Sequence, residues 1–141
     1  MLGLRMRTVA VAAVLMLATV GGCYWLRYGE IARTHAELLE RLAIDARDAV
    51  AAGHRLSNSD IETLRYPLER AEDFVRISDD DPPPESLVAL RETAASYREF
   101  VDLLDRLRVN EVAEPDKARV DALARRISDA AGRTRAALQN E

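Results

Sequence analysis

Residues 84–107, PESLVALRETAASYREFVDLLDRL, carry the longest amphipathic pattern in this chain of 141 residues. Apolar side chains recur there every three or four positions, which places them on one face of an α-helix. Pro84 suits the first turn of such a helix, and Glu85 suits its positively polarised start. The segment therefore predicts a long helix whose buried face consists of Leu87, Leu90, Ala94, Tyr97, Val101 and Leu104, widened by Phe100, Leu103 and Leu107.

Two further helices are predicted on the N-terminal side. The first ends at Gly53 and is followed by a turn over residues 56–58, after which Ser59 and Glu62 match a capping box that begins the second. The first helix is expected to bury Ile31, Leu38, Leu42, Ala46 and Ala49, with His35 between the first two. The second is expected to bury Ile61, Leu64, Leu68, Ala71 and Val75.

Three proline-containing segments shape the remaining predictions. Pro67 lies inside the second helix, where it removes a backbone hydrogen bond, so we expect a kink near residues 63–66 rather than a restart. Residues 79–84, DDDPPP, predict a stiff exposed connection and lack the alternating ligands of a calcium loop. After a loop at 110–114, Pro115 begins a fourth helix that buries Val120, Leu123, Ile127, Ala130, Thr134 and Ala137.

These four stripes predict an all-α protein. Short connections favour antiparallel neighbours, so we expect an up-down-up-down four-helix bundle preceded by an N-terminal signal or anchor helix. The stripes are rich in alanine, and each layer therefore buries only a modest apolar area. This composition predicts a marginally stable monomer or a protein that gains stability by pairing.

The N-terminal segment predicts export. Arg5 and Arg7 precede an apolar run over residues 9–20, which is the layout of a signal peptide. The following Val20-Gly21-Gly22-Cys23 resembles the lipobox of bacterial lipoproteins. This resemblance covers only the leader. It implies that residues 1–22 are removed, that Cys23 is acylated, and that residues 23–141 form the helical domain.

An uncleaved membrane helix is the alternative interpretation of the same segment. Residues 8–26 carry no charge and are nearly long enough to cross a bilayer. Tyr24, Trp25 and Tyr28 would then form an aromatic belt at the outer interface. A third interpretation leaves Cys23 as an ordinary thiol. The first two place the domain in a bacterial cell envelope, facing the periplasm or the exterior.

Net charge and side-chain chemistry argue against some classes of function. The net charge is −4, and it becomes −6 when Arg5 and Arg7 leave with the signal, which disfavours nucleic acid as a partner. We find no catalytic, cofactor-binding or metal-ligating pattern. His35 is expected to be a partly buried spacer, and His54 is expected to cap a helix C-terminus. The sequence therefore does not predict an enzyme.

The resulting functional hypothesis is a small structural or protein-interaction module, tethered to a membrane through Cys23 and engaging a protein partner or a second copy. The alternative is a ligand-sensing extracytoplasmic helical module held by an uncleaved transmembrane helix. Neither hypothesis requires a cofactor.

Overall fold

The computed structural model describes residues 28–78 and 83–140, which form four α-helices and no strand. The N-terminal helix covers residues 28–51. It is followed by α2 (Asn58–Ile77), α3 (Glu85–Leu107) and α4 (Glu114–Ala137). The prediction of an all-helical protein is thus confirmed for these residues.

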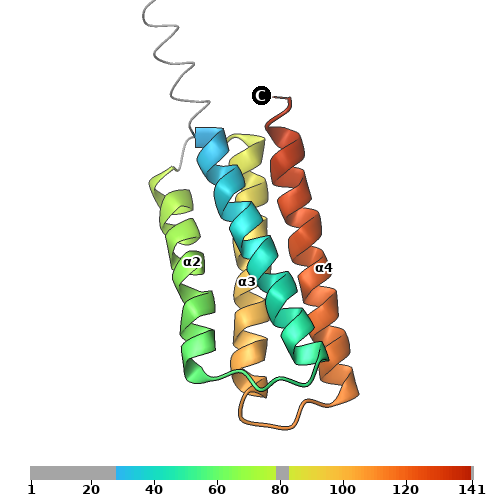
Figure 1. Cartoon of the computed structure of the whole chain (residues 1–141). Helices are drawn as coiled ribbons and strands as arrows, with labels where there is room; N and C mark the ends of the chain where they lie inside the picture. Colours follow the sequence, from blue (N-terminus) through green and yellow to red (C-terminus); the bar gives the residue numbers. More distant parts are fainter. Residues whose placement is uncertain (1–27, 79–82, 141) are drawn as a thin grey trace, which may run out of the picture.

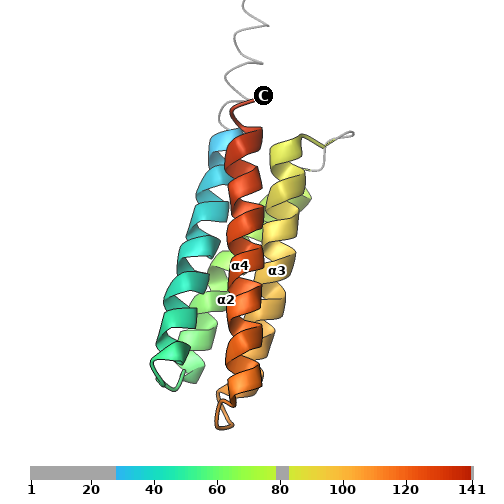
Figure 2. The same cartoon turned by 90° about the vertical axis from the view of Figure 1, so that its right-hand side faces the viewer.

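The four helices lie side by side with their axes nearly aligned (Figures 1 and 2). The N-terminal helix and α3 occupy opposite corners, with α2 and α4 between them. Residue 28 and the end of α4 lie at one end of the molecule, which we call the terminal end (Figure 1). The connections 52–57 and 108–113 lie at the other end, which we call the loop end.

A close contact joins the first and last helices at the terminal end. The Leu138 Cδ2 atom lies only 2.2 Å from the position that a Cβ atom on Gly29 would occupy. Glycine at this position therefore lets the start of the N-terminal helix approach the end of α4.

Gly53 ends the N-terminal helix through a Schellman motif. It has a positive φ of 81°, and its N–H donates to the Val50 carbonyl over 3.0 Å. The His54 N–H donates to the Ala49 carbonyl over 2.9 Å. Because glycine adopts positive φ without steric cost, the predicted stop at this residue is confirmed.

The capping box of α2 lies two residues before the predicted one. Ser57, not Ser59, is the N-cap: its hydroxyl accepts from the Asp60 N–H over 3.2 Å. The Asp60 carboxylate accepts in return from the Ser57 N–H over 2.7 Å, and these bonds hold its pKa below the ordinary value. The prediction of Ser59 and Glu62 was wrong. Ser57 and Ser59 each have an acidic residue three positions later, so the sequence contains two patterns that resemble a capping box.

Ser57→Ala is expected to lower the free energy of unfolding by about 0.5–2 kcal/mol, because the first turn of α2 loses its side-chain acceptor. Ser59→Ala is the matched control, and its effect should be close to zero. Urea unfolding at pH 7 followed by circular dichroism measures both. Equal losses in the two variants would contradict the observed cap.

Pro67 lies within an unbroken α2 and is buried. The helix does not restart at this residue. One turn earlier, the Leu64 carbonyl accepts a hydrogen bond from the Tyr97 hydroxyl of α3 over 3.1 Å. Tyr97 is fully buried, and its burial raises the pKa of the phenol. This bond gives the buried Tyr97 hydroxyl a partner that it would otherwise lack.

The buried faces of α2 and α3 are the predicted ones, and every residue named for them above is buried. In α4 the same holds except for Leu123, which is only partly buried. Pro115 lies in the first turn of α4 as predicted. Pro84 lies one position earlier than predicted, because it is the N-cap of α3 rather than a residue of its first turn.

The N-terminal helix buries a different face from the predicted one. The buried residues are Ala32, Ala36, Leu39, Ala43, Ala46 and Val50. Of the predicted stripe, only Ala46 is buried; Leu42 and Ala49 are half-buried, and Ile31 and Leu38 are 42% and 43% exposed. The reason lies opposite, where α3 fills the core with large side chains such as Tyr97, Phe100 and Leu90. Because the core is close-packed, the N-terminal helix fits against these large side chains mainly through small ones.

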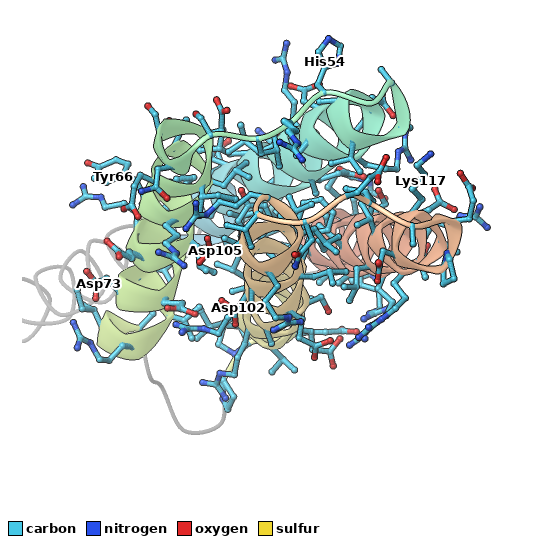
Figure 3. The ribbon with its side chains drawn as sticks, turned by 90° about the horizontal axis from the view of Figure 1, so that it is seen from below. His54, Tyr66, Asp73, Asp102, Asp105 and Lys117 are labelled. Atoms are coloured by element: carbon cyan, nitrogen blue, oxygen red, sulfur yellow. The ribbon has the colours of Figure 1, made fainter. Side chains whose placement is uncertain are left out.

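Ion pairs between neighbouring helices lie around this core. Arg65 of α2 contacts Asp105 of α3 over 2.8 Å, and Figure 3 shows Asp105 between these helices. Arg126 of α4 contacts Glu99 of α3 over 3.2 Å. Such partly exposed pairs each contribute little free energy, so the apolar core provides most of the stability.

Candidate interaction surface

The predicted lipidation residue, Cys23, lies outside the described residues, so its acylation stays a prediction. Residues 28–78 and 83–140 contain no helix that is both long and apolar enough to cross a membrane. In the same ranges, no three histidine, cysteine or acidic side chains are placed to hold a metal ion.

His35 lies within the N-terminal helix, and His54 lies in the connection that follows it. His35 is half-buried, and its ring centroid lies 5.3 Å from that of Phe74 in α2. Burial, together with the charge of Arg70, lowers the pKa of His35 below 6.5. The side chain of His54 is exposed at the loop end and points away from the helices (Figure 3).

The pKa of His35 predicts a pH dependence of stability. The folded state favours the neutral ring, so its contribution is complete above pH 6.5 and is lost as the pH falls through the lowered pKa. The wild-type protein is expected to lose more thermal stability between pH 7.5 and 5 than His35→Gln. His54→Gln is the control and should retain the wild-type decrease. Equal decreases in wild type and His35→Gln would contradict this role.

A first candidate surface is the exposed side of the N-terminal helix. Ile31 and Leu38 lie there at a spacing of two turns, and we call this pair the outer stripe. The half-buried His35 and Leu42 flank it on the side of α2. The helix therefore has a second apolar stripe, which the bundle covers only in part.

A second candidate surface is a hollow of about 590 Å³ between α2 and α3, which we call the α2/α3 hollow. Its apolar lining consists of Val75, Ala94 and Ala95. Ala95 is itself exposed, so the hollow is shallow at that position. Val75 and Ala94 are buried, so mainly Ala95 presents apolar surface to the hollow.

Charged side chains border the α2/α3 hollow. They are Glu72 and Arg76 from α2 and Arg91, Arg98 and Glu99 from α3. Arg98 Nε donates to Glu72 across the two helices over 2.9 Å, and this carboxylate raises the pKa of Arg98. Arg76 contacts Asp73 over 2.7 Å. Charges of both signs therefore alternate along the border of the hollow.

Neither surface could be predicted from the sequence. The outer stripe was assigned to the core, although its residues were correctly recognised as apolar. The hollow had one local signal: Arg91, Ala95 and Arg98 recur at helical spacing on the exposed side of α3. Its other wall comes from α2, and no spacing within α3 could show that.

No known protein family matches this chain, and none of the curated proteins or solved structures shows significant similarity to it.

Proposed function

We propose that this protein is a membrane-tethered interaction module of the bacterial cell envelope. In this proposal residues 1–22 are a signal peptide, Cys23 carries the lipid, and residues 23–141 form an antiparallel up-down-up-down bundle that presents a helical face to a protein. The proposal assigns no catalytic step and no cofactor to the bundle.

The outer stripe is the observation that carries the interaction part of the proposal. A surface helix normally needs one apolar face, which packs on the core. The N-terminal helix already buries such a face through Leu39, Val50 and four alanines. Ile31 and Leu38 lie outside this face, and their partly exposed apolar surface is available to a partner.

The placement of the termini supports the tether. The chain enters the bundle at residue 28, at the terminal end (Figure 1). A membrane anchor at Cys23 would hold this end close to the lipid surface. With about 1.5 Å rise per residue, a helix such as α4 (Glu114–Ala137) spans about 35 Å, so the loop end would stand about that far from the membrane.

Labelling with a radioactive fatty acid tests the tether. Cells that express the full chain are grown with palmitate, and the wild-type protein is expected to be labelled in the membrane fraction. Cys23→Ser should lose the label, because the thiol that accepts the lipid is gone. A label that persists in Cys23→Ser, or its absence in the wild type, would contradict acylation at this residue.

A ligand-sensing module is the second candidate function. The α2/α3 hollow supports it, since about 590 Å³ falls within the range of small-molecule sites. A thermal-shift screen against small metabolites tests this candidate. Stabilisation that disappears in Ala95→Trp, which fills the hollow, would favour sensing over the interaction module.

A further inference from the structure

We infer that Trp25 packs between the ends of α2 and α4 and closes the core at the terminal end. Trp25 itself lies outside the described residues, but these residues limit where it can be. An extended chain covers at most about 3.6 Å per residue, so Trp25 lies within about 11 Å of residue 28. The indole is therefore confined to the terminal end.

The buried face of the N-terminal helix leads upstream to Trp25. Its residues follow one another in alternating steps of three and four, and they are Gly29, Ala32, Ala36, Leu39, Ala43, Ala46 and Val50. The next step of four, taken back from Gly29, reaches Trp25. Residue 28 is already helical, and residues 24–27 contain neither glycine nor proline, so the sequence favours one more turn. That turn places the indole on the buried face of the helix.

The ends of α2 and α4 provide the surface against which the indole packs. On α2, the ring of Phe74 lies 5.2 Å from that of Tyr28, and Ser78 follows one turn nearer the terminal end on the same side. On α4, Leu138 lies against Gly29 and is only half-buried. Both helices therefore reach the level of the turn that precedes residue 28.

Ser78 supplies an independent reason for an occupant at this place. Its side chain is only 2% exposed, and its hydroxyl has no hydrogen-bond partner among the described residues. A buried hydroxyl without a partner is costly. An indole N–H is a donor that usually finds an acceptor when it is buried. Trp25 and Ser78 would each give the other the bond that burial requires.

Packing on the bundle accounts for more of these observations than insertion into lipid does. A tryptophan side chain removes about 150–250 Å² from water when it is buried, and it would add bulk to a helix face that consists mostly of alanine. An indole in the lipid interface would also find a favourable place. It would, however, leave the Ser78 hydroxyl without a partner and Leu138 partly exposed.

The consequence concerns the tether, and this part of the inference rests on the proposed function. Cys23 lies only two residues before Trp25. A lipid on Cys23 would then be joined to a packed residue without a flexible spacer. The bundle would stand at the membrane in one orientation, with its terminal end toward the lipid.

Fluorescence of the full chain tests the inference, because Trp25 is the only tryptophan. In detergent micelles, the wild-type protein is expected to show blue-shifted emission and weak quenching by acrylamide. Leu138→Asp should shift the emission to the red and raise the quenching several-fold. Ile77→Asp is the matched control, since it also adds a carboxylate at the end of a helix but at a residue that is 79% exposed. Its signal should equal that of the wild type.

Circular dichroism shows whether each variant is folded, and Leu138→Ala is a milder change that should alter the Trp25 signal in the same direction. An unchanged signal in folded Leu138 variants would overturn the inference, as would equal changes in Leu138→Asp and Ile77→Asp. Strong quenching of wild-type Trp25 by brominated phosphatidylcholine in vesicles would place the indole in lipid instead. The same measurements in Cys23→Ser should give the same result, so failure of the proposed acylation is distinguished from failure of the packing.

Discussion

Leu39→Ala is expected to lower the free energy of unfolding by about 2–5 kcal/mol, whereas Leu38→Ala is expected to change it by less than about 1 kcal/mol. The two residues are adjacent and the chemical change is identical. Leu39 is completely buried in the core cluster, and Leu38 is 43% exposed. Removing the first leaves a cavity, while removing the second only uncovers surface that water already reaches.

Urea unfolding of both variants measures this difference. A loss of several kcal/mol is a large fraction of the stability of a domain of this size, so Leu39→Ala should be partly unfolded before denaturant is added if the wild type is marginal. A larger loss for Leu38→Ala than for Leu39→Ala would mean that the N-terminal helix packs through the face predicted from the sequence.

Phe100→Ala is expected to cost about 3–5 kcal/mol. Phe100 has no exposed surface, and its ring centroid lies 6.2 Å from that of Tyr97 in the centre of the largest core cluster. The loss of the ring leaves a cavity in this cluster, which is the physical source of the cost.

Tyr66→Ala is the matched aromatic control. Tyr66 is 64% exposed and points away from the other helices (Figure 3), so its loss should change the stability by less than about 1 kcal/mol. Thermal unfolding followed by circular dichroism compares the two variants. A small effect of Phe100→Ala would contradict the packing of α3 in the centre of the core.

The faces of α2 and α3 could be predicted from the sequence because each has a single stripe of large apolar residues. In α3, for example, Leu90, Tyr97 and Leu104 follow one another at helical spacing, and the exposed side carries mainly charges. Only one orientation then buries the apolar area. Gly53 was equally predictable, since the residue that ends a helix in a left-handed conformation is commonly glycine.

The N-terminal helix could not be predicted in the same way, because it has two apolar stripes. The sequence pattern favours burial of Ile31 and Leu38 over burial of Ala32 and Ala36, because the first two have larger apolar side chains. The choice between the stripes depends on the volume left by Tyr97 and Phe100 of α3, which are distant in the sequence. The α2/α3 hollow was missed for the same reason, since its two walls come from different helices.

The intact mass of the protein extracted from bacterial membranes tests the central claim most directly. The account predicts a chain that begins at Cys23 and carries the additional mass of at least two fatty acyl chains, because a single chain holds a protein only weakly. A full-length, unmodified chain recovered from the soluble fraction would contradict the tether, and with it the proposed role of the bundle at a membrane surface.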